Sequence, residues 1–546
     1  MRLWEDSAKS DPALGDDLLR ARFRFKRGEF LRFLLPSIYS SPWNAFHLAV
    51  LGSDKRHWSE QLRDSRALNL APRGVGKSTL KKGDVAHSVC YGLRRFLVVV
   101  SATRDDAKGW AATLRQWFGP RDDSNAALHD LYGPFTLSGE QQRFTIAGPE
   151  GPCTILCTSV NASVQGANEL THRPDEVILD DWEDRKRVRS QTQREGWSRK
   201  LREEILKLGD RQRGLITEAC VTVNHPEQPS ARIRRGDEGF AGWDVHEFPA
   251  LLSWPEDLGL WNRAGRIFND LTLGDVETRE ACALAFYEAH RAEMDQGAEL
   301  LDPHLLPLFR CWLMIWAEGM SAFLREMQHK TQAPGEHLFD SRSFSRCQVS
   351  TDHAGALVVR LADGRKIAAA SAHRKGARWD PAMGTQGGDV AAIAVLLRDE
   401  HGYVAVVDCW RKVAPVSAQL AAAWTLAEKW GLTTISLESN GFQALIDQEF
   451  RRQREERKAA GQFWQLRLVL DASTGNKEDR LSTLEAPIAG GILQFAEHLD
   501  PDVFGEFDEF DGVPNSHQDG AHDAIEGAYA RLKGRAPSME REKRLR

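Results

Sequence analysis

The sequence predicts an α/β protein in which each half of the chain folds around its own sheet. In the first half, a glycine-rich turn at 69–79 stands between an apolar run and a helix-like segment. Apolar runs then alternate with helix-like segments, a pattern typical of a mostly parallel sheet covered on both faces. In the second half, three apolar runs separated by short turns indicate an antiparallel meander. At 546 residues, the chain is too long for a single hydrophobic core.

Composition narrows the class of protein. Hydrophobic residues make up 42% of the chain and charged residues 27%, as in ordinary soluble proteins and unlike disordered or membrane proteins. The N-terminus is charged, and the longest apolar run, Val390 to Leu397, is too short to span a bilayer. Eight cysteines without CxxC pairs predict reduced thiols in a cytosolic protein. The net charge of −6 argues against a uniformly basic nucleic-acid binder.

The glycine-rich turn has the composition of a phosphate-binding loop. Gly74 and Gly76 let the backbone curl so that its amide NH groups point at an anion. Lys77 can reach the terminal phosphates, and the Ser78 hydroxyl can ligate Mg²⁺. Ala71 stands where the pattern GxxxxGK[S/T] has its first glycine. The residues predicted to bind ATP and its Mg²⁺ are Arg73, Gly74, Val75, Gly76, Lys77, Ser78, Thr79 and Asp180.

An acidic motif further along the chain supports this prediction. A buried-looking strand at 177–179 runs directly into a cluster of carboxylates. In ATPases with such a loop, the carboxylate at this strand end holds Mg²⁺, and a neighbouring acid positions the attacking water. Asp180 fits the first role, and either Asp181 or Glu183 fits the second.

The other elements of the first half follow from its apolar runs and helix breakers. Residues 16–52 mix basic and apolar positions, which predicts amphipathic helices that form a lid beside the base of the nucleotide. The last predicted strand ends in Thr222 and Asn224, which either lie beside the γ-phosphate or simply cap the strand. Further elements are expected as strands at 67–70, 96–102, 154–157 and within 214–224, and as helices from Thr79 and at 105–118.

A middle region joins the two halves. Residues 185–202 form a basic stretch. Three interpretations stay open: the stretch contacts a nucleic-acid backbone, it supplies an arginine to a neighbouring subunit's nucleotide, or it is a solvated helix face. Residues 248–255 look extended, a helix is expected at 320–328, and 331–336 has the composition of a linker.

The second half is predicted to bring together three carboxylates. Strands are expected at 377–382, 387–397, 403–408 and 433–438, with helices at 416–430 and near the end of the chain. These elements deliver Asp380, Glu438, and either Asp519 or Asp523. Carboxylates brought together repel one another unless cations neutralise them, and two Mg²⁺ or Mn²⁺ ions roughly 4 Å apart can cut a phosphodiester. Asp389 is a candidate auxiliary ligand, and Lys477 or Arg480 could steer a DNA phosphate.

Both halves together resemble the large terminase subunit of tailed bacteriophages. The resemblance rests on the loop at 71–78, the Asp180-Asp181 motif, the 248–255 stretch, and the motifs WDPA, GGD, SLESN, NKEDR and HQDGAHDA in family order. It implies a P-loop NTPase domain with a parallel-rich sheet, followed by a ribonuclease H-like α/β nuclease domain. Lys77 and Ser78 are then nucleotide and Mg²⁺ contacts, and Asp180 is the Mg²⁺-associated acid. Asp380, Glu438 and Asp519 are the nuclease metal ligands, with Asp523 the alternative to Asp519.

The resemblance also implies a function and partners. The protein is expected to be an ATP-driven translocase for double-stranded DNA and a metal-dependent endonuclease that cuts concatemeric DNA. Expected partners are a small terminase subunit, the portal protein of the procapsid and further copies of the chain in a ring, in the cytoplasm of the infected host. Two alternatives stay open: a helicase-like repair ATPase fused to a nuclease, and a nucleotide-switched DNA-binding assembly protein with an inactive nuclease domain.

These patterns divide the chain into five predicted segments. They are an N-terminal helical lid at 1–55, an ATPase core at 56–240, a connecting subdomain and linker at 241–335, a nuclease domain at 336–535 and a basic tail at 536–546.

Overall fold

The protein forms two compact units. The computed structural model describes residues 12–52, 64–164, 172–184, 187–188, 190–210, 212–330, 337–383, 389–438, 443–471, 477–510 and 520–533. The first unit comprises Met1–Pro255, Gly297–Leu308 and Leu324–Thr331, and the second comprises Glu256–Gln296, Phe309–Phe323 and Gln332–Arg546. The five segment boundaries expected from sequence stay predictions. Among the described residues, no helix is both long and apolar enough to cross a membrane.

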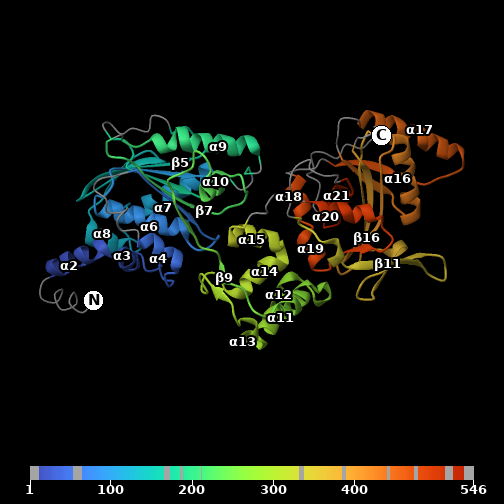
Figure 1. The fold of residues 1–546 in the computed structure, drawn as a ribbon, viewed down its shortest axis with the longest axis horizontal. Helices are drawn as coiled ribbons and strands as arrows, with labels where there is room; N and C mark the ends of the chain where they lie inside the picture. Colours follow the sequence, from blue (N-terminus) through green and yellow to red (C-terminus); the bar gives the residue numbers. More distant parts are fainter. Residues whose placement is uncertain are drawn as a thin grey trace. The chain divides into compact units, whose positions relative to one another are not determined.

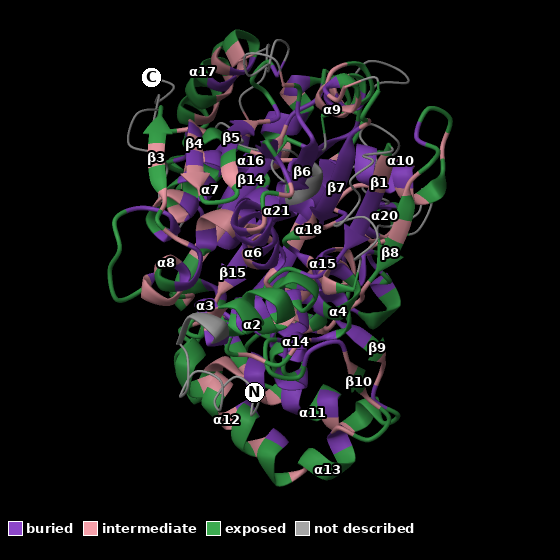
Figure 2. Ribbon diagram, turned by 90° about the vertical axis from the view of Figure 1, so that its left-hand side faces the viewer, coloured by how far each residue is buried: buried purple, intermediate pink, exposed green. Residues whose placement is uncertain are grey.

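The first unit is built on an eight-stranded sheet in the order β3-β4-β5-β2-β6-β7-β1-β8. The pairs from β5 through β8 are parallel, whereas β3, β4 and β5 pair antiparallel at one edge. Figure 2 shows β6 and β7 as buried strands, and the predicted parallel-rich sheet is confirmed. The strands are β1 (Ser65–Leu70), β2 (Phe96–Ser101), β3 (Thr136–Gly139), β4 (Arg143–Gly148), β5 (Gly151–Ser159), β6 (Glu176–Asp180), β7 (Ile216–Val221) and β8 (Asp244–Glu247).

Helices cover both sides of this sheet, with α6, α7 and α8 on one side and α9 on the other (Figure 1). The apolar side of α9 packs through Trp197 and Leu201 against sheet residues such as Leu68 and Leu179. This accounts for part of the basic 185–202 stretch, whose Arg199 remains exposed. The helices are α2 (Pro12–Phe25), α3 (Arg27–Leu34), α4 (Ala45–Leu51), α6 (Lys77–Cys90), α7 (Arg104–Trp117), α8 (Ala126–Tyr132), α9 (Gln191–Glu203), η1 (Ile205–Lys207) and α10 (Pro229–Arg235).

The N-terminal helices are tied to α6, the helix that follows the glycine-rich turn. Arg27 of α3 pairs with Asp84 of α6 at 2.9 Å, and both side chains are almost completely buried. Lys81 pairs with the same carboxylate at 2.9 Å and also with Glu218 of β7. Buried charges are stable only when paired, so removing one member leaves the others uncompensated. The network therefore fixes α3, α6 and β7 against one another.

A two-stranded sheet and a helical group complete the connecting region. β9 (Leu251–Ser253) and β10 (Glu299–Leu300) pair antiparallel within the first unit, and β9 confirms the extended segment expected near 248–255. In the second unit, Trp261 stacks on Trp312 with ring centroids 4.9 Å apart. The helices of this region are α11 (Leu258–Asn269), η2 (Leu271–Leu273), α12 (Val276–Ala289), α13 (Arg291–Met294), α14 (Leu308–Glu318) and α15 (Met320–Gln328).

The second unit is centred on a nine-stranded sheet in the order β13-β12-β11-β19-β16-β15-β14-β17-β18. β14, β15 and β16 form the predicted antiparallel meander, and β17 lies parallel to β14. The strands are β11 (Arg346–Thr351), β12 (Leu357–Arg360), β13 (Lys366–Ala368), β14 (Arg374–Asp380), β15 (Ala391–Arg398), β16 (Val404–Lys412), β17 (Thr434–Glu438), β18 (Arg467–Asp471) and β19 (Leu493–Ala496). The helices are η3 (Ser341–Ser343), η4 (Ala369–Ser371), α16 (Val416–Trp430), α17 (Gln443–Ala459), α18 (Lys477–Ser482), α19 (Glu485–Ala489), α20 (Pro501–Glu509) and α21 (Gly520–Leu532).

Strand β14 sends alternate side chains to opposite faces of the sheet. Trp379 is fully buried and donates a hydrogen bond from Nε1 to Gln419 of α16 at 3.1 Å. On the other face, Arg378 lies against α21, where a Cβ added to Gly527 would come within 1.9 Å of the Arg378 Cδ. The close approach of α21 to β14 therefore requires glycine at position 527. Asp380, two residues after Arg378, points to the same face as α21.

Candidate active sites

The glycine-rich turn of the first unit has the backbone conformation that its sequence predicts. Gly74 and Gly76 have φ angles of 88° and 81°, in the left-handed region that glycine adopts without strain. Gly76 is the N-cap of α6, and Lys77 is the first residue of that helix. The NH groups at the start of a helix are a ready-made site for an anion. The turn is thus shaped to hold phosphate.

The Lys77 side chain is buried against the turn and does not extend into solvent. Its side chain is 5% exposed, and its ammonium group donates to the Ala71 carbonyl at 3.0 Å and to the Thr222 hydroxyl at 2.7 Å. It also lies 3.5 Å from an Asp181 carboxylate oxygen. Neutral acceptors and one half-exposed carboxylate hold this charge, so a phosphate oxygen could replace them as a stronger partner. Thr222, suggested from sequence as a γ-phosphate neighbour, therefore lies at this lysine.

Asp180 ends β6 at the same edge of the sheet as the turn. β7 separates β6 from β1, and all three strands are parallel, so their carboxyl ends meet. The Asp180 Oδ2 accepts a hydrogen bond from Trp110 Nε1 at 2.7 Å. Burial, and secondarily the nearby Asp181, raises the pKa of Asp180 to about 6, although Ser78 and Trp110 hydrogen bonds oppose this shift. A cation at this carboxylate would relieve the cost of its burial.

The two candidates for the water-positioning acid have different environments. Asp181 has a φ of 37°, uncommon for a residue other than glycine. Its side chain is 51% exposed, and it accepts a hydrogen bond from the Thr222 backbone NH at 3.1 Å. The backbone strain therefore sets a partly exposed carboxylate beside the Lys77 ammonium group.

Glu183 is held away from solvent by the start of α10. Its oxygens accept hydrogen bonds from the Ser230 backbone NH at 2.8 Å and from Gln228 Nε2 at 2.7 Å. The Ser230 hydroxyl donates a further hydrogen bond at 2.5 Å. Burial raises the pKa of Glu183 to about 7 despite these donors. Three of its acceptor positions are committed to α10, which is the arrangement of a residue that fixes a helix end.

Sequence reasoning missed a histidine beside the turn. His47 of α4 donates from Nε2 to the Val75 carbonyl at 2.7 Å, while its Nδ1 accepts from the Asn44 backbone NH at 3.3 Å. Asn44 in turn donates to Asp302 at 2.7 Å. The only local signal was Asn44 and His47 spaced as a capping box before an apolar run. That signal predicts a helix start and says nothing about what the histidine contacts.

The remaining predicted nucleotide contacts are distributed around the turn. The Arg73 side chain is 72% exposed and lies 4.0 Å from Glu326, a weak ion pair that leaves the guanidinium accessible. Thr79 accepts a hydrogen bond at its carbonyl from the Tyr39 hydroxyl at 2.8 Å. Asn224 donates to the Thr222 carbonyl at 3.3 Å, as expected for a residue that closes the end of a strand.

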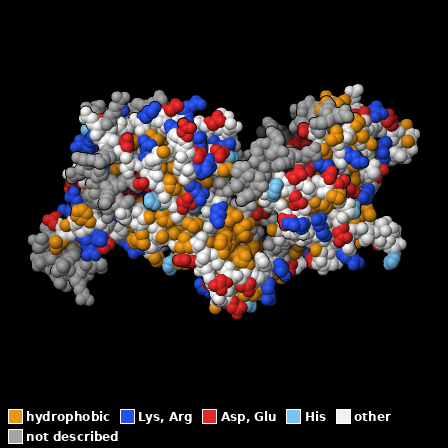
Figure 3. All heavy atoms as spheres, in the orientation of Figure 1, with side chains coloured by type: hydrophobic (Ala, Val, Ile, Leu, Met, Phe, Trp, Pro, Cys, Tyr) orange, Lys and Arg blue, Asp and Glu red, His pale blue; other side chains and the backbone are white. Residues whose placement is uncertain are grey.

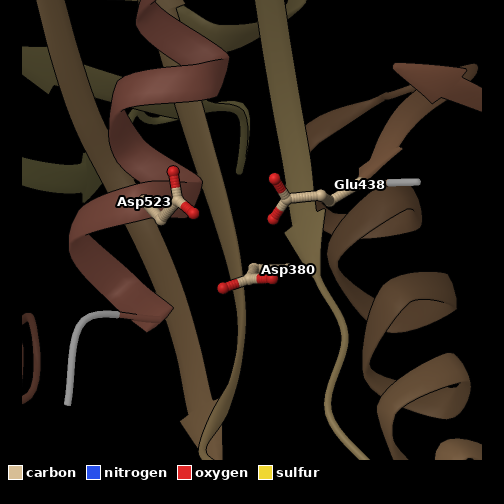
Figure 4. A group of neighbouring side chains, drawn as sticks. All are labelled: Asp380, Glu438 and Asp523. Atoms are coloured by element: carbon tan, nitrogen blue, oxygen red, sulfur yellow. The ribbon is translucent and has the colours of Figure 1, made fainter. Parts of the chain in front are cut away.

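The second unit brings three predicted carboxylates to one place. Asp380 ends β14, Glu438 ends β17, and Asp523 lies in the first turns of α21. Figure 4 shows the three carboxylates pointing into a common space, and one oxygen of each lies within 4.8 Å of the others. Clustered carboxylate oxygens are the ligands that Mg²⁺ and Mn²⁺ prefer. These residues therefore fit a metal site.

Buried arginines lie behind the carboxylates. Arg378 is 3.5 Å from Glu438 and 3.1 Å from Asp471. Arg480 pairs with Asp523 at 3.0 Å and with Glu526 at 2.8 Å. Both guanidinium groups are nearly buried, so their charges are committed to this cluster. They reduce the repulsion among the acids before any cation binds.

Sequence reasoning recognised only some of the residues that surround the three carboxylates. Arg480, named with Lys477 as a residue that could steer a DNA phosphate, contacts the acids directly in the structure. Arg378 was missed, although its place two residues before Asp380 on a strand puts both side chains on one face. Asp389 is exposed and is not among the three grouped carboxylates. Asp519 and the side chain of Lys477 lie outside the described residues.

The family comparison addresses the second unit. Residues 377–531 match the family described as the terminase RNaseH-like domain. This segment is therefore similar to the RNaseH-like domain of terminases. The matched range contains all three grouped carboxylates and both buried arginines, and it confirms the predicted resemblance to large terminase subunits in this domain. No curated protein matches the chain.

Several solved structures resemble most of the chain or about half of it. The large terminase of the thermophilic bacteriophage D6E is 9% identical, over 89% of this chain and 98% of that chain, with a TM-score of 0.42. The large terminase of bacteriophage HK97 is 12% identical, over 86% and 88% of the two chains, with a TM-score of 0.28. The large terminase ATPase domain of Thermus phage P74-26 is 13% identical, over 46% of this chain and 94% of that chain, with a TM-score of 0.26.

Proposed function

We propose that this protein is a phage DNA-packaging enzyme in which an ATPase moves double-stranded DNA into a procapsid and a metal-dependent endonuclease cuts it. The observation that carries the proposal is the convergence of Asp380, Glu438 and Asp523 inside a terminase RNaseH-like domain. The phosphate-binding turn of the first unit supplies the second requirement, an ATP site on the same chain.

In the ATPase, each group at the turn has a proposed role. Backbone NH groups from Gly74 to Thr79 hold the phosphates, and the Lys77 ammonium group moves from its present carbonyl acceptors to the terminal phosphate. Ser78 and Asp180 would hold Mg²⁺. Asp181 orients the attacking water, because it is exposed beside Lys77, whereas Glu183 is committed to α10.

In the nuclease, Asp380, Glu438 and Asp523 would hold two Mg²⁺ or Mn²⁺ ions, with Asp519 and Asp389 as the remaining proposed ligands. Bound ions of this kind supply an activated water and stabilise the leaving oxygen of a phosphodiester. Arg378 and Arg480 hold the carboxylates of Glu438 and Asp523 in place and limit their mutual repulsion.

Translocation and assembly extend the same proposal. Lysine and arginine side chains are interspersed with acidic ones on the face drawn in Figure 3, so DNA bound on this face would be held by local basic groups. The exposed Arg199 of α9 is a candidate for such a contact or for a neighbouring subunit's nucleotide. The proposed partners are the portal protein, a small terminase subunit and further copies of the chain in a ring, in the host cytoplasm.

Cleavage of supercoiled plasmid tests the nuclease. Wild type, Glu438→Ala and Lys77→Ala are compared with Mn²⁺ or Mg²⁺, and ATP hydrolysis is measured in the same preparations. We expect Glu438→Ala to lose cutting and keep ATPase activity, and Lys77→Ala to do the reverse. Equal cutting by wild type and Glu438→Ala would refute the site, and no cutting with either metal would favour an assembly protein with an inactive nuclease domain.

A second experiment separates packaging from repair. ATP hydrolysis is measured with and without empty procapsids that carry portal, and strand displacement is measured on a forked DNA. Stimulation by procapsids without strand displacement supports the packaging enzyme. Strand displacement without stimulation would instead identify a helicase-like repair ATPase.

A further inference from the structure

The second unit contains a cavity that the proposed function does not use. Its volume is about 400 Å³, within the range of sites that take one small molecule. It is lined by residues from α11 to α12, α14, the β15–β16 turn, α19 with the turn after it, and the end of α21. α21 has 13 residues and therefore rises about 20 Å. Asp523 lies in its first turns, whereas Tyr529 and Lys533 meet the cavity at its other end.

The charged groups lining this cavity are all basic. The charged residues are Arg279, Arg398 and Lys533, and no aspartate or glutamate is found among the described lining residues of the cavity. Arg279 donates a hydrogen bond to the Phe268 carbonyl at 2.8 Å, and Arg398 donates one to the Leu532 carbonyl at 2.6 Å. Within the described ranges, neither arginine is ion-paired with a carboxylate. The cavity therefore has a net positive lining that an anion would neutralise.

A neighbouring cavity of the same unit shows the opposite arrangement. It has a volume of about 380 Å³ and is lined by both arginines and aspartates. Arg365 pairs there with Asp363 and Asp399, and the Tyr403 hydroxyl contacts Asp270. The charge of Arg365 is thus compensated by neighbouring carboxylates. Arginines without a carboxylate partner, as found among the described residues of the first cavity, are therefore not a general feature of this unit.

One residue that lines the cavity carries a buried polar group without a hydrogen-bond partner among the described residues. Tyr529 is 3% exposed, and its hydroxyl is buried with no hydrogen-bond partner in the part of the chain that the structure describes. A buried hydroxyl without a partner costs free energy that a ligand acceptor would recover. Burial raises the pKa of Tyr529, so the hydroxyl keeps its proton and can donate it. Phe268, Trp316 and Leu532 supply apolar walls around it.

We propose that this cavity binds a small anion with an apolar body, whose charged group meets Arg279, Arg398 and Lys533 and accepts a hydrogen bond from Tyr529. The apolar body packs against Phe268 and Trp316. Two common compounds have this chemistry: a nucleoside monophosphate and an aromatic carboxylate such as a peptide's terminal tryptophan. The site is independent of the proposed ATPase and nuclease chemistry.

Calorimetric titration of the full-length protein tests the site with two matched pairs of probes. Thymidine 5′-monophosphate is compared with thymidine, and N-acetyltryptophan with N-acetyltryptophan amide. Only binding that Tyr529→Phe weakens is counted, so phosphate binding at the first unit does not contribute. We expect the anion of one pair to bind and its neutral counterpart to bind at least about tenfold more weakly. If the protein binds the nucleotide more tightly, the ligand is a nucleoside monophosphate, and if it binds N-acetyltryptophan more tightly, the ligand is an aromatic carboxylate.

Three variants distinguish the loss of a ligand contact from unfolding of the protein. Tyr529→Phe should weaken binding about tenfold without lowering the melting temperature of the free protein, because it removes an unsatisfied hydroxyl. Lys533→Gln, at an exposed position, should weaken the anion and leave its neutral counterpart unchanged. Arg266→Gln in the neighbouring cavity should change neither. Failure of both anions to bind, or equal binding by Tyr529→Phe and wild type, would overturn the proposal.

Discussion

The two candidate catalytic sites are assembled in different ways. At the nucleotide turn, one continuous segment supplies the left-handed glycines, the lysine and the helix start, and Lys77 rests on backbone carbonyls and a hydroxyl. At the nuclease site, two strands and a helix each supply one carboxylate, and buried arginines hold them. The first site depends on local backbone conformation, whereas the second depends on paired charges from distant parts of the chain.

This difference predicts which kind of substitution disrupts each site. A local turn is lost when its backbone cannot reach the required φ angles, whatever the rest of the unit does. A cluster of like charges is lost when a compensating charge is removed, because the remaining acids repel one another in a poorly solvated place. Four predictions test this contrast, from the largest expected effect to the smallest.

The largest effect should come from one nuclease carboxylate. Asp380→Asn removes a proposed ligand and should lower plasmid cleavage by about 100-fold or more. The same change relieves repulsion among the acids, so without metal it should raise the free energy of unfolding by about 0.5–2 kcal/mol. Cleavage assays and urea unfolding measure the two effects.

Asp389→Asn is the matched control for this change, because Asp389 is exposed and outside the grouped carboxylates. It should alter stability little. A loss of cleavage as large as that of Asp380→Asn would make Asp389 a full ligand and require a different metal arrangement.

Removing a buried arginine should have the largest effect on stability. Arg480→Met leaves Asp523 and Glu526 without their shared partner and should lower the free energy of unfolding by about 3–5 kcal/mol. Arg342→Met removes an exposed ion pair with Asp340 and should change the free energy of unfolding far less, because solvent screens exposed pairs. Urea unfolding compares the two, and equal costs would show that Arg480 does not compensate the acids.

A glycine at the nucleotide turn should show the local type of failure. Gly76→Ala forces a Cβ into a φ of 81°, at a cost of about 1–2 kcal/mol. The added Cβ would lie 3.6 Å from His47 Nε2, an ordinary contact, so the strain comes from the backbone. ATP hydrolysis should fall at least about tenfold while plasmid cleavage is kept.

The comparison for this variant is Gly109→Ala in α7. Nothing lies within 4 Å of a Cβ at position 109, and its φ is not positive. Alanine there should stabilise the protein by up to about 1 kcal/mol. If Gly76→Ala matched it in melting temperature and ATPase rate, the turn would not need its left-handed residue.

The smallest effect should be a pH dependence at Glu183. Burial raises the pKa of Glu183 in the folded protein to about 7. At pH values between the pKa of Glu183 in the unfolded chain and about 7, the folded protein therefore binds more protons than the unfolded chain. The contribution of Glu183 to stability is therefore fully present at low pH and is lost as the pH rises through that window.

Urea unfolding of wild type and Glu183→Gln, measured between about pH 4 and pH 8, isolates this contribution to stability. The difference between the two free energies should change with pH in the stated direction, since glutamine does not titrate. A difference that is constant with pH would show that Glu183 is not buried in its protonated form.

Much of the fold could be predicted because its signals are local. The apolar runs of β2, β6 and β17 are continuous, and breakers bound α16 and α15, so their positions matched the structure within a few residues. The carboxylates at the ends of β14 and β17 could be predicted for the same reason, because each directly follows a recognisable strand.

The sequence by itself determined the nucleotide turn, the alternation of strands and helices, and the kinds of residue that carry chemistry. Those features depend on the conformational range of glycine and on periods of two and 3.6 residues, which neighbouring residues set. Only the tertiary structure decided that Asp523 joins Asp380 and Glu438, that Arg480 lies among acids, and that His47 contacts the turn. Each of these contacts joins segments far apart in the chain, and their geometry follows from how whole elements pack, which no local pattern encodes.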